Sequence, residues 1–318
     1  WFVGASADIT TKGRLIVVNS GLSDAVVDVN VFTENGKQPL RTLDVPSKNY
    51  LVIPVDSLAP GDKTLTVNVL PRSGRINSFM IDEQGKGLRA LGGDLVNPIN
   101  APSKTLVIPA IPNQKKKPGQ SAGTTHVLRV LTPGDVDASV TVELVSGDGV
   151  FIPVGLNSRS VSAGQVTELT FSPSISSTVF AVKITSTEPI VAAVESSVVV
   201  GGRRDFTWST PAPELTGFTM AVTGLEPLIA FTGAEINVAV EITLVNGKVL
   251  RKTIKGSDIA TWKVPASARS FTITKVGKQT YAGALVSSVN GYGYFPIAPG
   301  SVLTRVEVPD SNIRILNP

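Results

Sequence analysis

Three segments of the chain decide its fold: AVVDVNVFTENG from Ala25 to Gly36, ASVTVELVSGDG from Ala138 to Gly149 and NVAVEITLVNG from Asn237 to Gly247. In each, three aliphatic residues alternate with other residues, and a glycine follows nine positions after the first of them. A period of two places these side chains on one face of a β-strand. The Asn-Gly or Asp-Gly pair supplies the positive φ that a tight turn needs. Each segment therefore predicts a strand that ends in a hairpin turn.

The residues after each turn also match, which indicates a threefold repeat. Each copy continues through two further apolar runs into a fourth strand, and it closes with a proline-rich bend. The bends are at residues 98–102, 211–213 and 296–299. The sequence therefore predicts three domains, at residues 1–104, 105–213 and 214–318.

Short alternating strands with frequent turns are typical of antiparallel β-sandwiches of the immunoglobulin or fibronectin type. A β-propeller is the competing repeat architecture, but its blades have only about 40–50 residues. Helix is not expected, because the best candidate, Met80 to Leu95, contains four glycines and each costs roughly 1 kcal/mol inside a helix. We expect an all-β chain of three tandem sandwiches.

The spacing between copies differs and locates a loop. Val27 and Val140 are 113 residues apart, whereas Val140 and Val238 are 98 apart. The excess falls largely on residues 109–125, PAIPNQKKKPGQSAGTT, which has too few apolar residues to pack. We expect a basic, exposed Pro/Gly loop there, near the first domain boundary. The second boundary, near residues 213–216, is short and predicts a fixed angle between the second and third domains.

The composition leaves little for chemistry. Among 318 residues there is one histidine, His126, and no cysteine, and charged residues make up 17% against a usual value of about 25%. A thiol nucleophile, an iron–sulfur cluster and a disulfide are excluded, and no GxSxG element presents a serine. The most apolar run, Pro189 to Val200, is interrupted by Glu195 and falls short of a membrane span. We expect a protein that is not an enzyme and that needs no cofactor.

One cluster of basic residues is a candidate site for an anionic polymer. It combines Lys115, Lys116 and Lys117 with Arg203 and Arg204. Phosphate-rich polymers bind such clusters, but three lysines in a Pro/Gly loop are more often a solvated tip that aids solubility. No aromatic residue lies among the lysines to stack on bases, so nucleic acid is not expected.

A second candidate is an aromatic set in the third domain, made of Trp262, Tyr281, Tyr292 and Tyr294. Tyrosine and tryptophan have flat faces and polar tips that suit contact with a sugar or a protein. The structural alternative is that Tyr292 and Tyr294 alternate on one face of a strand and pack there. Trp1 and Trp208 are expected to fill a core or a junction between domains.

Two pairs of carboxylates are candidate calcium ligands: Asp24 with Asp28, and Asp135 with Asp137. Each pair supplies fewer than the six oxygens that Ca²⁺ requires. We therefore expect no resident metal.

The motifs LIVVNSG (Leu15 to Gly21), LRVLTPG (Leu128 to Gly134) and DFTWSTPAPEL (Asp205 to Leu215) occur in order along the chain after Trp1. With these motifs the chain resembles an uncharacterised family of secreted or membrane-anchored envelope proteins of high-GC Gram-positive bacteria. Ser20 stands where that family's pattern has proline. The resemblance implies an exported protein, with an anchor or signal upstream of Trp1, and it transfers no functional residue.

These observations favour a non-catalytic module of the cell envelope, a rod of sandwiches that spaces or holds a partner. The expected partner is an envelope protein or a cell-wall polymer. One alternative is a protein that binds wall carbohydrate or an anionic polymer. Another is a subunit of a surface assembly such as a pilus, a surface layer or a virion. The oligomeric state is left open.

Overall fold

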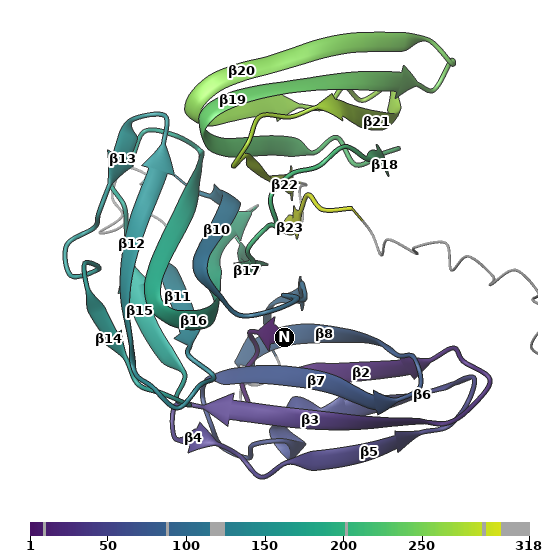
Figure 1. The fold of residues 1–318 in the computed structure, drawn as a ribbon, viewed down its shortest axis with the longest axis vertical. Helices are drawn as coiled ribbons and strands as arrows, with labels where there is room; N and C mark the ends of the chain where they lie inside the picture. The colour runs from purple at the N-terminus through teal and green to yellow at the C-terminus, as the bar shows by residue number, and fades with distance from the viewer. Residues whose placement is uncertain (9–10, 87–88, 115–124, 201–202, 288–290, 300–318) are drawn as a thin grey trace, which may run out of the picture.

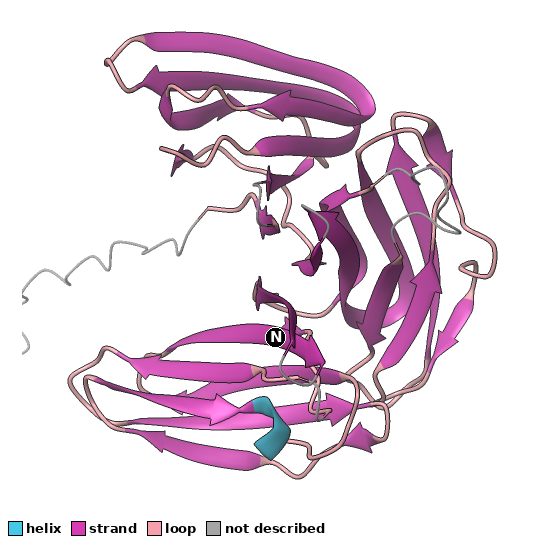
Figure 2. Ribbon diagram, turned by 180° about the vertical axis from the view of Figure 1, so that it is seen from behind, coloured by secondary structure: helices cyan, strands magenta, loops and turns pink. Residues whose placement is uncertain are grey.

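The computed structural model describes residues 1–8, 11–86, 89–114, 125–200, 203–287 and 291–299. Almost all regular structure is β-strand, and every strand pair is antiparallel (Figure 1). Figure 2 shows the single helical turn of the described residues, a 3₁₀ turn at Val55–Ser57. The prediction of an all-β, antiparallel fold is confirmed.

The strands fall into three groups along the chain, which we call the N-terminal, middle and C-terminal units. The N-terminal unit contains β1 (Phe2–Val3), β2 (Arg14–Asn19), β3 (Ala25–Thr33), β4 (Gly36–Lys37), β5 (Arg41–Val45), β6 (Asn49–Pro54), β7 (Leu65–Ser73), β8 (Asn77–Lys86) and β9 (Arg89–Val96). The middle unit contains β10 (Ser103–Pro112), β11 (His126–Leu131), β12 (Ala138–Ser146), β13 (Gly149–Phe151), β14 (Arg159–Val161), β15 (Thr167–Phe171), β16 (Val179–Val200) and β17 (Arg203–Ser209). The C-terminal unit contains β18 (Thr219–Ala221), β19 (Leu228–Leu244), β20 (Val249–Lys263), β21 (Ala268–Lys275), β22 (Tyr281–Ser287) and β23 (Tyr292–Pro296).

The same pairing order occurs in all three units. One sheet of the N-terminal unit has the order β6-β2-β8-β9, and the other has β3 between β5 and β7, with β1 on the far side of β7. The middle unit repeats these orders with β15-β11-β16-β17 and with β12 between β14 and β16. In the C-terminal unit they are β20-β19-β22-β23 and β20-β19-β21-β18. The repeat found in the sequence is therefore a repeat of topology.

Long bent strands replace pairs of strands in the later units. β16 pairs with β12 through its first half and with β11 through its second half. β19 and β20 likewise run through both halves of the one six-stranded sheet of the C-terminal unit, with a register shift between Gly233 and Ile236. The sequence pattern indicated separate strands at Val179–Ile184 and Ile190–Val194, but the structure joins them. Apolar and polar residues continue to alternate through the bend in β16, so the sequence pattern does not show whether the two segments form one strand or two.

The predicted turns are present, and two of them share a side-chain contact. Gly36, Gly149 and Gly247 all have positive φ. Thr33 Oγ1 accepts a hydrogen bond from the backbone N–H of Asn35 (3.1 Å), and Ser146 Oγ accepts one from Asp148 (3.1 Å). A hydroxyl residue three positions before the glycine therefore fixes the first two turns in the same way.

Buried apolar residues form one large cluster per unit, but the first cluster crosses a unit boundary. It contains most of the N-terminal core together with six residues of the middle unit: Leu131, Val166, Val191, Ala193, Phe206 and Trp208. The middle and C-terminal units have clusters of their own. The N-terminal and middle units therefore share part of a core, and the division into three domains stays a prediction.

The expected loop at residues 109–125 is wrong over its first part. β10 extends through Pro112, and Ala110 and Ile111 are fully buried. The register of β10 against β16 shifts between Ile108 and Ile111, where Ala110 has a φ of 58°. Proline is tolerated at bulges and edge strands, which is why the prolines there do not end the strand. Residues 115–124 lie outside the described part of the chain.

The arrangement of the units supplies the angles that the sequence left open. Figure 1 shows them as an arc, in which the middle unit lies between the other two and β17 and β23 lie near the centre. The N-terminal and C-terminal units touch directly, because Asn97 Nδ2 donates a hydrogen bond to the carbonyl of Tyr294 (2.9 Å).

Candidate functional site

The joint between the N-terminal and middle units is centred on Trp208. This side chain lies on β17 and is fully buried. Its indole Nε1 donates a hydrogen bond to Asp82 Oδ2 on β8 (2.9 Å), and its backbone N–H donates to Asp94 Oδ2 on β9 (2.6 Å). The prediction that Trp208 fills a core or a junction is confirmed, and it does both.

Arg129 is the buried cation of this joint. It lies on β11, its guanidinium is 4.8 Å from the centre of the Trp208 ring, and its side chain is 4% exposed. Nη1 donates hydrogen bonds to the carbonyls of Ala5 (2.5 Å) and Leu65 (3.2 Å), which both belong to the N-terminal unit. Nη2 bonds Glu168 Oε1 (2.8 Å). A guanidinium has five donors in a fixed fork, so this one residue links β11 to two carbonyls of the N-terminal unit in defined directions.

Carboxyl groups outnumber cations in the joint. Burial raises the pKa of Asp82 and of Glu195, and the nearby positive charge of Arg129 offsets only part of that rise. Burial raises the pKa of Asp94 to about 7, although Trp208 and Thr207 donate hydrogen bonds to it. Gln84 Nε2 reaches Glu195 Oε1 across the joint (3.2 Å). Desolvation disfavours the charged forms of these carboxyl groups. The joint is therefore more stable when they are protonated.

Asp205 connects all three units. It lies on β17, where burial raises its pKa and the nearby backbone N–H groups of Phe206 in its own strand, Tyr292 in the C-terminal unit and Gly93 in the N-terminal unit offset part of that rise. A Cβ on Gly92 or on Gly291 would collide with the Asp205 carboxylate. The outer units therefore approach this side chain so closely that a Cβ at either glycine would force it to move.

The joint between the middle and C-terminal units is smaller and apolar. Its buried members are Ala110 and Val179 of the middle unit and Ala230, Leu285 and Tyr294 of the C-terminal unit. The Tyr294 hydroxyl donates a hydrogen bond to the carbonyl of Thr210 (2.6 Å). These contacts join the two units, and the fixed angle between them stays a prediction.

The remaining candidate for acid–base chemistry, His126, is a core residue. Its ring stacks on Phe171 (5.3 Å between centres) and meets the edge of Phe180 (5.1 Å), and its Nδ1 lies 2.9 Å from Ser196 Oγ. Burial lowers its pKa to about 3. A permanently neutral, enclosed imidazole is unsuited to proton transfer with a substrate near neutral pH.

The predicted basic cluster is only partly within the described structure. Lys115, Lys116 and Lys117 lie outside the described residues, as does the side chain of Arg203. Arg204 is exposed and lies opposite Val199 in the β16–β17 pair.

The four aromatic residues do not form one exposed surface. Trp262 is 5% exposed and packs edge-on against Phe271 inside the C-terminal unit (5.5 Å between ring centres). Tyr294 is buried in the second joint, Tyr292 packs beside it, and Tyr281 is half-buried. The alternative in which Tyr292 and Tyr294 share a packed face is confirmed.

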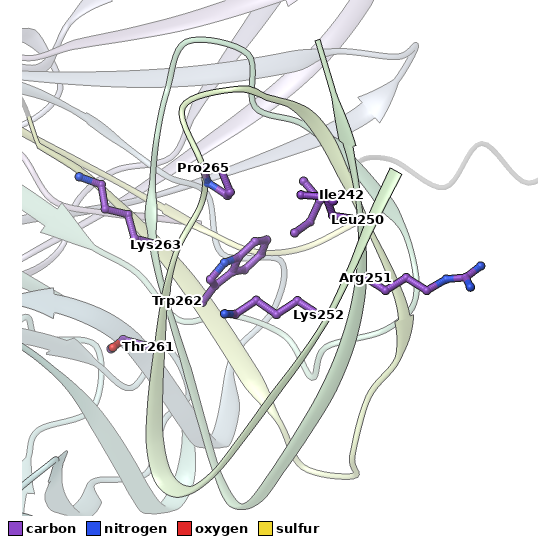
Figure 3. Close-up of a pocket in the computed structure, with 8 residues that line it drawn as sticks. All are labelled: Ile242, Leu250, Arg251, Lys252, Thr261, Trp262, Lys263 and Pro265. Atoms are coloured by element: carbon purple, nitrogen blue, oxygen red, sulfur yellow. The ribbon is translucent and has the colours of Figure 1, made fainter. Parts of the chain in front are cut away.

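A shallow hollow of about 500 Å³ opens in the C-terminal unit between the two halves of β20 (Figure 3). Ile242, Leu250, Trp262 and Pro265 form its apolar wall, and three cationic residues, Arg251, Lys252 and Lys263, also line it. Arg251 pairs with Glu241 (2.8 Å). Neither lysine forms an ion pair within the described residues.

Three of the four paired aspartates, Asp24, Asp28 and Asp137, have structural partners. Asp28 accepts hydrogen bonds from Thr42 (2.7 Å) and from Arg72 (2.5 Å). Asp24 accepts a hydrogen bond from the backbone N–H of Ser47 (2.8 Å), and Asp137 accepts one from the backbone N–H of Ala163 (2.8 Å). Within the described ranges, no three His, Cys, Asp or Glu residues lie close enough together to hold a metal ion. In the same ranges no helix is long and apolar enough to cross a membrane.

Sequence analysis missed the residues that join the units, apart from Trp208. Asp82, Asp94, Arg129 and Asp205 are ordinary polar residues in alternating strands, where a solvent-facing position is the usual reading. One signal was available: Arg129 stands in LRVLTPG at the position that Ile16 occupies in LIVVNSG. Both side chains point out of their own sandwich, and what covers them is decided by the neighbouring unit.

A family model described as a family of unknown function, DUF5719, matches residues 1–264. No curated protein and no solved structure matches the chain.

Proposed function

The chain belongs to the DUF5719 family, and from its geometry we propose that it is a non-catalytic scaffold of the cell envelope, which holds three β-sandwich units at fixed angles and presents their surfaces to a partner. One observation carries the proposal: the Asp205 carboxylate of the middle unit lies directly against Gly92 of the N-terminal unit and Gly291 of the C-terminal unit, so the three units meet at a single point. A chain that only needed length would not require its first and third units to meet there.

The first joint supports a fixed arrangement. Interfaces between domains of one chain allow relative motion unless they are large and hydrophobic. Here the apolar cluster is continuous between two units, and Arg129 and Trp208 form hydrogen bonds across it. Moving the units apart would expose Trp208 and leave the carbonyls of Ala5 and Leu65 without their donor. The joint therefore resists bending.

Small-angle X-ray scattering of two matched variants tests the scaffold. Gly291→Ala places a Cβ against the Asp205 carboxylate, whereas Gly293→Ala places one in open space two residues away. We expect the first variant to scatter with a larger radius of gyration than the wild-type protein, and the second to match the wild type. The proposal would be contradicted if the wild-type curve could be fitted only by an ensemble of different unit arrangements. Identical curves for all three proteins would also contradict it.

Location and partner are also part of the proposal. The resemblance described above supports an exported protein whose partner is an envelope protein or a cell-wall polymer. Fractionation of cells that produce the full-length protein tests the first point, with recovery in the cytosol as the contradicting result. Co-purification after crosslinking on intact cells tests the second.

A second candidate function, binding of an anionic polymer, is favoured by the hollow of the C-terminal unit. Lys252 lies opposite Val240 in the β19–β20 pair, so it faces the interior side of the sheet. Its charge and that of Lys263 have no acidic partner among the described residues. Lys252→Met should weaken the binding of a polyphosphate probe, whereas Lys255→Met, on the other face of β20, should not. Equal binding by both variants would remove this candidate.

A further inference from the structure

One sheet face occupies the same place in each unit, and its positions correspond residue by residue. It is the outward side of the sheet built on β2, on β11 or on the first half of β19, and we call it the docking face. Four positions define it by strand register: Ile16, Phe79, Ile81 and Leu95 in the N-terminal unit; Arg129, Ala193, Glu195 and Trp208 in the middle unit; Ala230, Gly283, Leu285 and Tyr294 in the C-terminal unit.

In the middle unit, the N-terminal unit covers the docking face. Arg129 bonds the carbonyls of Ala5 and Leu65, and Trp208 bonds Asp82. Ala193 belongs to the apolar cluster of the N-terminal unit. The face is therefore buried by the unit that precedes it in the chain.

In the C-terminal unit, the middle unit covers the docking face. Ala230, Leu285 and Tyr294 cluster with Ala110 and Val179. A Cβ on Gly283 would lie 2.9 Å from the Pro109 side chain, so the two backbones approach closely. In both joints, therefore, the docking face of a unit is covered by the unit that precedes it in the chain.

In the N-terminal unit, no other unit covers the docking face within the described residues. Val52, Phe79 and Leu95 are 47%, 46% and 46% exposed, and Tyr50 beside them is 60% exposed. The register places Ile16 between Val52 and Phe79, and Ile81 beside Leu95. Adjacent apolar side chains on an exposed face mark an interaction site. The face that is buried in the other two units is therefore apolar and uncovered here.

The covering surface also repeats. It lies at one end of each unit, where Ala5 (φ 62°) and Ala110 (φ 58°) have the same unusual backbone conformation. In the C-terminal unit the backbone bond from Val222 to the carbonyl of Arg269 corresponds to the bond from Gly4 to the carbonyl of Leu65. This end exposes Leu225 (44%) and Val245 (64%). The last unit therefore has a covering end with no successor among the described residues.

We propose that the bare docking face of the N-terminal unit binds the free end of the C-terminal unit of a second copy of this chain, so that copies join head to tail. Continuity with the two joints inside the chain carries the assignment, since both already pair this face with this end. The docking face has no charge at its four defining positions, and the end carries exposed aliphatic side chains that match it. A contact between two different surfaces leaves one of each free, so addition continues into a filament or closes into a ring.

Sedimentation velocity over a concentration series tests the proposal. The wild-type chain should increase in average mass with concentration. Phe79→Lys blocks the docking face, and Val245→Lys blocks the free end, so each variant alone should weaken association at least about tenfold, as burial of an unpaired charge in an interface predicts. Leu22→Lys, at a loop position that is 85% exposed, is the control and should associate like the wild type.

Mixing the two blocked variants distinguishes head-to-tail contact from other contacts. A Phe79→Lys chain keeps its free end and a Val245→Lys chain keeps its docking face, so the mixture should form a dimer that grows no further. A wild-type chain that stays monomeric up to millimolar concentration would overturn the proposal. Association that Val245→Lys leaves unchanged would also overturn it, because the faces would then pair with each other. Circular dichroism checks that each variant is folded.

Discussion

The two joints of the molecule use the same positions with different chemistry. At the first joint the aromatic residue is Trp208, which bonds a buried carboxylate beside a buried guanidinium. At the second joint the corresponding residue is Tyr294, which bonds a backbone carbonyl among alanine, valine and leucine side chains. Arg129 at the first joint corresponds to Ala230 at the second.

The difference shows two ways of fixing an angle between sandwiches. An apolar joint gains stability from each buried atom, but only the fit of the two surfaces sets the orientation of the units. A joint with a buried guanidinium depends on direction, since its donors must meet particular carbonyls. Buried ion pairs are weak evidence for stability, yet losing one partner is costly. The first joint should therefore be the more sensitive to single substitutions and to pH.

The largest expected effect follows removal of the buried cation. Arg129→Met should lower the free energy of unfolding by about 3–5 kcal/mol, because a buried charged group is lost. The buried carbonyl of Ala5 then lacks its donor, the carbonyl of Leu65 keeps only the Gly4 N–H, and the partly exposed Glu168 loses its cation. The control is Lys183→Met, which breaks the more exposed pair with Glu143 (2.9 Å) and should cost about 0–1 kcal/mol. Urea denaturation measures both. Equal costs would show that the guanidinium does not hold the joint.

A smaller loss is expected when only the indole donor is removed. Trp208→Phe keeps most of the ring but leaves Asp82 without its hydrogen bond, at a cost of about 1–3 kcal/mol plus lost contacts. The variant should also alter the scattering curve, because the lost bond joins two units. A thermal melt and a scattering profile indistinguishable from the wild type would contradict this.

The pH dependence should be specific to the first joint. A carboxyl whose pKa is raised on folding stabilises the folded state below its unfolded pKa, and this contribution is lost as pH rises through the folded pKa. For Asp94 the loss runs from about pH 4 to about pH 7. Asp94→Asn should therefore stabilise the protein by roughly 1–3 kcal/mol at pH 7.5 and by little at pH 4.5.

Comparing the variant with the wild type at each pH removes the opposite contribution of His126, whose lowered pKa favours the folded state as pH rises. Denaturation curves at the two pH values give the difference. The same effect at both values would mean that Asp94 titrates normally in the folded protein.

The smallest effect is expected at the second joint. Tyr294→Phe removes one neutral hydrogen bond to the Thr210 carbonyl and should cost about 0.5–1.5 kcal/mol, independent of pH between 5 and 8. A cost larger than that of Trp208→Phe would reverse the comparison between the joints. Chemical denaturation of the two variants side by side decides the order.

The sequence predicted the elements well and the sites poorly, for related reasons. The alternating valines of residues 25–33 and the positive-φ glycines Gly36, Gly149 and Gly247 are local signals, and the structure confirms the strand and turns that they predict. The aromatic set was gathered by composition, but Trp262 faces the interior of its unit while Tyr294 faces a neighbouring unit. Outward positions in a strand look alike whether water or another unit covers them.

The sequence by itself determined an all-β chain that repeats one strand pattern three times, because alternation and turn residues act over a few positions. Only the tertiary structure decided that the units form an arc, that Trp208 meets Asp82 across 126 residues, and that one docking face is left bare. Those outcomes depend on how whole sandwiches pack, and packing selects partners by shape and desolvation at positions far apart in the chain.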